Sequence, residues 1–204
     1  MKAYDANLLE LLSRSGTQFM VPIYQRVYSW GEEECGRLWA DILHAGRSVR
    51  LDSHFTGSIV YVERDQGTRT STEPDLLIDG QQRVTTIMLL LAALAERLEL
   101  MPEGEREPVE GFSPRKIRNR YLVNADEDGD RYYKLVLSKS DREALKAVID
   151  HAPPPDASTS RVLENVEYFR DLLDSDGLDL VDICNGLKKL VIVDVSLSRG
   201  KDDP

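Results

Sequence analysis

The order of apolar and polar residues predicts alternating helices and strands. Apolar residues at helical spacing predict helices over 6–14, 29–44, 81–100, 141–151, 161–173 and 178–187. Short runs rich in β-branched or aromatic residues predict strands over 19–23, 55–63, 76–78, 132–137 and 190–197. Polar or Pro- and Gly-rich stretches predict loops at 64–73, 101–113 and 152–160. These elements indicate an α/β (α+β) fold, and no internal repeat is visible.

Polar residues are concentrated where the 76–78 strand meets the 81–100 helix. They stand in the order Asp79, Gly80, Gln81, Gln82 and Arg83. The first turn of a helix presents unpaired N–H groups and the positive end of the helix dipole, which together favour an anion. Arg83 adds a planar, permanently charged guanidinium that suits a phosphate. We therefore expect an anion site, although Asp79 also fits a capping box in which Gln82 reaches back.

Several side chains of this junction can coordinate a metal ion, orient a water or donate a hydrogen bond. Asp79 can coordinate a divalent ion or orient a water. Gln81 and Gln82 cannot act as bases near neutral pH, but their amides can orient a water or read a base edge. Thr85 and Thr86 can add hydroxyl donors, or can bond within the first turn of the helix.

A second polar and aromatic cluster lies at an earlier strand-to-helix turn, with Tyr24, Gln25, Arg26 and Trp30. Such side chains can stack on a base and bind a phosphate. Trp30 can instead staple the following helix to the core, and Ser29 fits as the N-cap of that helix. For Gln25 and Arg26 we favour a functional role, because long polar side chains between apolar neighbours have little structural reason to be there.

Two further signals are weaker alone. The run 115–120 carries positive charges on Arg115, Lys116, Arg118 and Arg120, and can follow a nucleic-acid backbone or form a solvated helix face. The net charge of −10 argues against a whole-surface affinity for nucleic acid but leaves a local basic groove open. Gly57 stands where a backbone or a ligand can approach the 55–63 strand closely.

Cysteine and histidine form no metal-site pattern. Cys35 and Cys184 are far apart, and we expect free buried thiols in a reducing cytosol. The three histidines have no HxH or HExxH spacing. The apolar run 87–95 is too short for a membrane span, which needs about 20 residues. We therefore expect a cytoplasmic protein with no membrane partner.

Taken in order, these segments resemble the N-terminal domain of GmrSD-type modification-dependent restriction proteins, which is related to the ParB/sulfiredoxin fold. The segments that carry the resemblance are 22–30, 38–42, 55–60 and 78–86, and the most specific is the Asp-Gly-Gln-Gln-Arg sequence at 79–83. The resemblance implies a small mixed sheet with flanking helices. On this basis we expect a ParB-like nucleotide-binding core at 1–101. A mainly helical extension at 114–204 would end in a strand and be truncated from a longer protein.

In that family the domain binds and hydrolyses nucleoside triphosphate and couples this to recognition of modified DNA. The expected cofactors are GTP or another nucleoside triphosphate, and Mg²⁺ held at Asp79. The expected catalytic residues are Asp79, Gln81, Gln82 and Arg83. The expected nucleotide-binding residues are Arg26, Gly80, Arg83, Thr85 and Thr86. The expected DNA-sensing residues are Tyr24, Gln25, Trp30, Arg115, Lys116, Arg118 and Arg120.

The expected partners are modified double-stranded DNA and an HNH-type nuclease domain or subunit, and homo-oligomerisation is left open. The neighbourhood of Tyr24 and Gln25 also fits the SspE branch, which senses phosphorothioate. No HNH signature occurs in this chain. Gln81 and Gln82 stand where sulfiredoxins carry a cysteine, which rules out thiol chemistry. Two alternatives remain: a module that binds modified DNA without hydrolysis, and a ParB-like clamp switched by a nucleotide.

Overall fold

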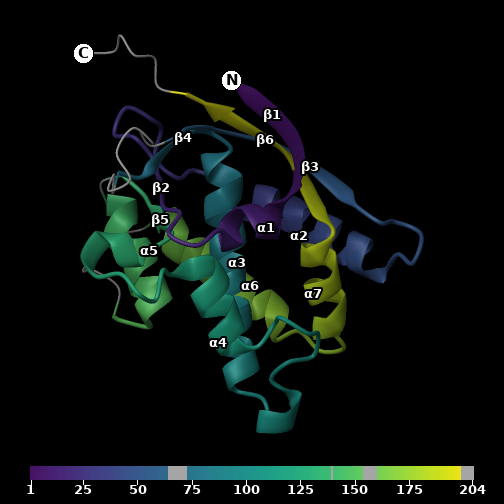
Figure 1. Ribbon diagram of the computed structural model, residues 1–204. Coiled ribbons are helices and arrows are strands. Elements are labelled where there is room, and N and C mark those ends of the chain that lie inside the picture. The colour runs from purple at the N-terminus through teal and green to yellow at the C-terminus, as the bar shows by residue number, and fades with distance from the viewer. Residues whose placement is uncertain (64–72, 139, 154–159, 199–204) are drawn as a thin grey trace.

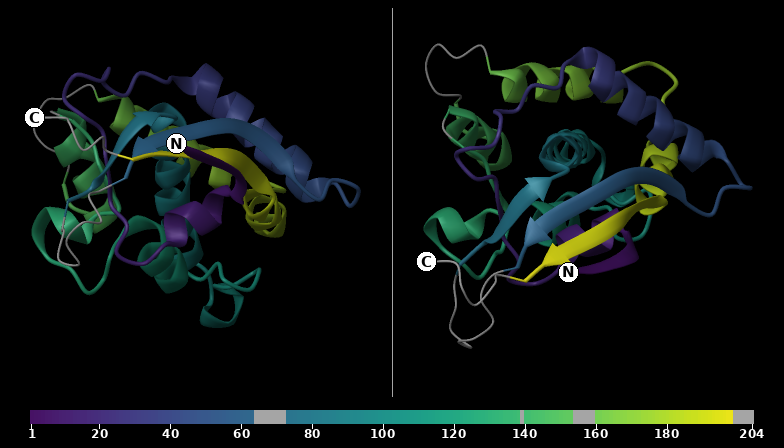
Figure 2. Two further views of the ribbon diagram at one scale, coloured as in Figure 1. Left: turned by 45° about the horizontal axis from the view of Figure 1, so that its top comes forward. Right: turned by 90° about the horizontal axis from the view of Figure 1, so that it is seen from above.

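One mixed sheet organises the protein, and the helices gather on one side of it (Figures 1 and 2). The computed structural model describes residues 1–63, 73–138, 140–153 and 160–198. Its strands are β1 (Lys2–Asn7), β2 (Phe19–Met20), β3 (His54–Val62), β4 (Asp75–Asp79), β5 (Leu135–Val136) and β6 (Leu190–Leu197). Its α-helices are α1 (Leu8–Ser13), α2 (Glu32–Arg47), α3 (Gln81–Glu99), α4 (Pro114–Ile117), α5 (Ser140–Asp150), α6 (Arg161–Leu173) and α7 (Leu180–Lys188). Shorter helical turns are η1 (Glu103–Glu105), η2 (Arg118–Leu122) and η3 (Gly129–Tyr132).

The strand order confirms the predicted α/β fold with a mixed sheet. The order is β1-β6-β3-β4-β2-β5. The β1–β6 and β3–β4 pairs are antiparallel, whereas the β3–β6, β2–β4 and β2–β5 pairs are parallel. Strands β5 and β6 come from the expected 114–204 extension, yet both pair with strands of the first 101 residues. The two expected parts therefore share one sheet.

The two faces of the sheet differ in burial. Along β6 the buried residues alternate with half-buried ones, and the buried set is Leu190, Ile192, Asp194 and Ser196. The helices cover this inner face. The buried carboxylate of Asp194 is paired with Arg14 at 2.6 Å, which offsets the cost of taking that charge out of water.

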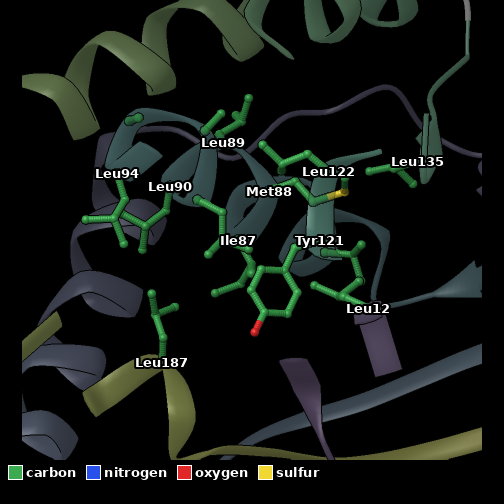
Figure 3. Packing of buried hydrophobic residues seen from close by; sticks show 14 of the residues in the cluster. Leu12, Ile87, Met88, Leu89, Leu90, Leu94, Tyr121, Leu122, Leu135 and Leu187 are labelled. Carbon is green, nitrogen blue, oxygen red and sulfur yellow. The ribbon is translucent and has the colours of Figure 1, made fainter. Parts of the chain in front are cut away.

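Helix α3 runs through the centre of the core and is buried on almost every side. Figure 3 shows leucines and other apolar side chains of α3 surrounded by residues from α1, η2, β5 and α7. A helix that is apolar all round is stable only where other elements cover all its faces. The nine apolar residues of the run 87–95 are buried accordingly. The packing of α3 on all sides therefore fixes the position of its N-terminus.

The first predicted helix was too long, because strand β1 precedes it. Residues Lys2–Asn7 pair with β6 along an exposed edge, where a hydrophobic pattern is weak. The helix begins after Asn7, whose side-chain oxygen accepts hydrogen bonds from the amides of Leu9 and Glu10. This is an N-cap that the apolar spacing alone did not locate.

The predicted N-cap of the second helix was also wrong. Helix α2 is capped at Gly31, and the carboxylate of Glu34 accepts a hydrogen bond from the Gly31 amide at 2.9 Å. Ser29 lies two residues before this cap, and both its amide and its hydroxyl donate to Oε1 of Gln82 instead. The predicted 132–137 strand shrinks to β5, since η3 winds the chain just before it. The predicted helix at 161–173 and strand at 190–197 are confirmed as α6 and β6.

Other expectations concern loops, cysteines and the membrane. Most of the predicted loops at 64–73 and 152–160 lie outside the described residues. Cys35 and Cys184 are free and buried, as expected. Among the helices of the described part, none combines the length and the apolar character that crossing a membrane requires.

Helices α2 and α7 cross so closely that each presents a glycine to the other. A Cβ atom at Gly186 would lie 2.0 Å from the carbonyl oxygen of Ile42. We expect Gly186→Ala to lower the free energy of unfolding by about 2 kcal/mol, because overpacking outweighs the gain in helix propensity. Urea denaturation measures the change. Gly104→Ala, with no atom within 4 Å of the added Cβ, is the matched control; equal losses in both variants would contradict the close crossing.

Candidate functional site

The two polar clusters predicted from the sequence meet at one hollow of about 410 Å³. It lies where β4 ends and α3 begins. Its lining consists of Gln25, Arg26, Trp30, Ile78, Asp79, Gly80, Gln81, Gln82 and Arg83. Segments far apart in the sequence are therefore adjacent here, and most of the expected nucleotide-contacting residues share one surface.

A left-handed glycine shapes the entrance to helix α3. Gly80 has φ +86°, and a Cβ atom there would lie 2.9 Å from the carbonyl oxygen of Ser58. Both facts require glycine at this position. Gly80 is itself the N-cap, and no side chain caps the helix. The amides of the first turn (81–83) therefore have no acceptor within the helix, and these three residues line the hollow.

The predicted capping role of Asp79 was wrong. Asp79 is the last residue of β4 and its side chain is exposed, because the turn at Gly80 separates it from the helix. Gln82 does not reach back toward it, since its amide is engaged elsewhere. The carboxylate of Asp79 thus lies at the rim of the hollow, where a cation or a water can approach it.

Arg83 projects along the hollow with its guanidinium half buried. Its Nη1 donates a hydrogen bond to the carbonyl oxygen of Ser58 at 3.0 Å. The guanidinium lies over Gly57, which has φ +112° and whose absent Cβ would stand 2.6 Å from Nη2. Burial lowers the pKa of Arg83, and the charge of Asp79 acts in the opposite direction. Arg83 forms no ion pair with any described carboxylate, so a partly desolvated cation is left for an anion to approach.

Gln82 clamps the second cluster onto the start of α3. Its Oε1 accepts hydrogen bonds from the amides of Ser29 (2.8 Å) and Trp30 (3.2 Å). Its Nε2 donates to the carbonyl oxygen of Val27 at 3.2 Å. Gln81 makes one longer contact, from its Nε2 to the Oε1 of Gln25 at 3.3 Å. Of the two amides expected to orient a water, that of Gln82 is therefore occupied by the main chain, whereas that of Gln81 borders the hollow.

Two residues that sequence reasoning did not select for the site complete this support. Asp141 accepts a hydrogen bond from the Tyr28 amide at 2.8 Å. Asn165 donates to the Tyr28 hydroxyl (2.9 Å) and to the carbonyl oxygen of Trp30 (2.8 Å). Asn165 had a usable signal, because it is an amide on the apolar face of α6. For Asp141 the sequence carries no comparable signal.

Thr85 and Thr86 face the protein interior. Their hydroxyls donate to the carbonyl oxygens of Gln81 (2.7 Å) and Gln82 (2.8 Å), one turn earlier in the helix. The Thr86 hydroxyl also meets that of Tyr28 at 2.7 Å. Neither threonine lines the hollow. Both hydroxyls therefore make local hydrogen bonds within the helix, which is the alternative given above for these threonines.

The expected DNA-sensing residues fall into two groups. Gln25 and Trp30 line the hollow, and the side chain of Tyr24 is exposed on the same turn. The basic residues lie instead on α4 and η2, which pack beside α3 far from the end of β4 (Figure 1). Two of the four are engaged in ion pairs, Lys116 with Glu107 and Arg118 with Asp150. The structure does not bring this basic run to the hollow.

The clamp by Gln82 has a measurable effect on stability. We expect Gln82→Leu to lower the free energy of unfolding by about 2–4 kcal/mol, because it leaves the amides of Ser29 and Trp30 without their acceptor. Thermal and urea denaturation report the loss. Gln25→Leu is the matched control, since it removes only one long hydrogen bond; a Gln82→Leu protein as stable as Gln25→Leu would contradict the clamp.

Comparison with known proteins agrees with this arrangement. A search of curated proteins finds no match. A family model described as the GmrSD restriction endonuclease N-terminal domain matches residues 8–203, which includes both clusters at the hollow and the supporting residues on α5 and α6. The chain therefore belongs to the family of GmrSD restriction endonuclease N-terminal domains and is a module of an antiphage restriction system.

Proposed function

We propose that the hollow binds the phosphates of a nucleoside triphosphate. The observation that carries the proposal is the uncapped N-terminus of α3 beside the half-buried guanidinium of Arg83. Free amides, the helix dipole and an incompletely paired cation all favour the same anion. Arg26 lines the hollow from the opposite turn, with no ion pair to any described residue, and supplies a second cation.

The other residues that line the hollow suit the base of a nucleotide and a bound metal ion. A volume of about 410 Å³ is in the range of small-molecule sites. Trp30 provides an aromatic surface for a base. Mg²⁺ is usually held by one or two carboxylates and the substrate phosphates, and the exposed Asp79 at the rim meets that need. The described residues contain no cluster of three or more metal-ligating side chains.

Hydrolysis at this site would depend on positioning and charge. Bound Mg²⁺ would neutralise phosphate charge. The amide of Gln81, which makes one long hydrogen bond to Gln25, would orient an attacking water, whereas Gln82 acts by holding the neighbouring turn. Arg83 and Arg26 would stabilise the charge that develops on the transferred phosphoryl group.

We further propose that the exposed turn beside the hollow senses modified DNA. Ile23 and Tyr24 are 75% and 73% exposed, an unusual display of large apolar side chains. Tyr24 can stack on a base or cover an apolar modification, with Gln25 at its side. Arg115 and Arg120, on α4 and η2 rather than at the hollow, would meet the DNA backbone at a separate surface. The nuclease activity of the system would come from an HNH-type domain or subunit.

Nucleotide binding is tested by calorimetry with GTP and ATP in the presence of Mg²⁺. We expect Arg83→Ala to weaken binding by about 10- to 100-fold, because it removes a charge-assisted contact worth about 1.5–3 kcal/mol. The control is Arg50→Ala, an exposed arginine outside the hollow, which leaves the affinity unchanged. Equal affinity of wild type and Arg83→Ala would exclude Arg83 as a phosphate ligand. Phosphate release by the wild type would reject the alternative of a module that binds without hydrolysis.

DNA sensing is tested with a phosphorothioate duplex and an unmodified duplex of the same sequence. We expect wild type to prefer one of them, and Tyr24→Ala to lose that preference, because stacking on an aromatic ring contributes about 1–3 kcal/mol per base. Fluorescence anisotropy gives both affinities. Tyr4→Ala, which truncates another exposed tyrosine, keeps the preference. A Tyr24→Ala protein that discriminates like wild type would exclude this turn as the sensor.

A further inference from the structure

Asp141 is a buried carboxylate whose role so far is to support the turn at Tyr28 through one hydrogen bond. It lies near the start of α5 and is only 6% exposed. Its Oδ2 accepts the hydrogen bond from the Tyr28 amide. It forms no ion pair within the described part of the chain. Burial raises the pKa of this carboxyl, and the hydrogen bond from Tyr28 opposes the shift. An isolated buried carboxylate is costly, so its position calls for a reason beyond a single amide contact.

A small void connects Asp141 with the candidate site. Its volume is about 10 Å³, close to what one water molecule needs. Its lining includes Asp141, Ser138 and Tyr28 as well as Arg26 and Gln81. Arg26 and Gln81 also line the main hollow. Arg26 therefore borders both the hollow and the water-sized space beside Asp141.

We propose that Asp141 is a positioning residue that holds Arg26 toward the phosphates of the bound nucleotide. The inference rests on the proposed nucleotide site. Asp141 acts through the main chain at Tyr28, two residues after Arg26, and through a water in the void. No direct ion pair between Asp141 and Arg26 is present. A carboxylate makes a stronger hydrogen bond to an amide than a neutral acceptor does, and so it fixes more firmly the turn that carries Arg26.

The test is a double-mutant cycle on nucleotide affinity with GTP and ATP as probes. Asp141→Asn keeps an oxygen for the Tyr28 amide and removes the charge. We expect it to weaken binding by about 3- to 10-fold when Arg26 is present. In the Arg26→Ala background the same change has an effect of less than about twofold, because the residue that Asp141 positions is gone. Asp171→Asn, on the exposed face of α6, is the matched control and leaves affinity unchanged.

Each other outcome has a distinct meaning. Equal losses in both backgrounds would mean that Asp141 only supports the fold, and would overturn the inference. Tighter binding by Asp141→Asn would mean that its charge simply repels phosphate, and would overturn it as well. A wild-type protein that binds no nucleotide removes the proposed function, and the inference with it. If Asp141→Asn does not fold, Asp141→Ser, whose hydroxyl can accept the Tyr28 amide through the water, completes the same cycle.

Discussion

The side-chain amide of Gln82 is the contact on which the geometry of the hollow depends. It satisfies two amides and one carbonyl of the 27–30 turn, which has no regular secondary structure of its own. Gln82 stands in the first turn of α3. Most side chains of this helix are buried among several other elements (Figure 3). These hydrogen bonds therefore anchor the irregular turn to α3, the most firmly packed helix of the fold. A buried amide held by several hydrogen bonds is directional in a way that apolar packing is not.

Support for the same turn comes from three separate parts of the chain. Gln82 holds it from α3, Asp141 from α5 and Asn165 from α6. The sheet is assembled in the same way, because β5 and β6 pair with strands from the first 101 residues. A site that is built from both halves cannot form in either half alone. The family match over residues 8–203 includes all three of these supporting elements.

The sequence predicted the elements whose burial is strongly patterned. Helices α3 and α6 and strand β6 were located closely, because each has a continuous apolar face or alternation. Strand β1 was missed, because it is an exposed edge that depends on pairing with a strand almost 190 residues later. Both polar clusters of the site were visible as local patterns. Their partners were not, since the direction of a side chain such as Gln82 or Asp141 is decided by tertiary contacts that local sequence does not encode.

The start of α3 departs from what stability alone would favour. At an ordinary N-cap an aspartate satisfies a first-turn amide and stabilises the helix by a few tenths of a kcal/mol relative to glycine. Instead the left-handed glycine forgoes the cap and keeps Asp79 on the strand, and the half-buried Arg83 has no carboxylate partner among the described residues. These small penalties are concentrated at one hollow, while the rest of α3 is well packed. Such unfavourable local features are expected at a site where a bound ligand compensates for them. An anion bound to the free amides and to Arg83 would remove both penalties together, which joins the stability of this helix end to its proposed function.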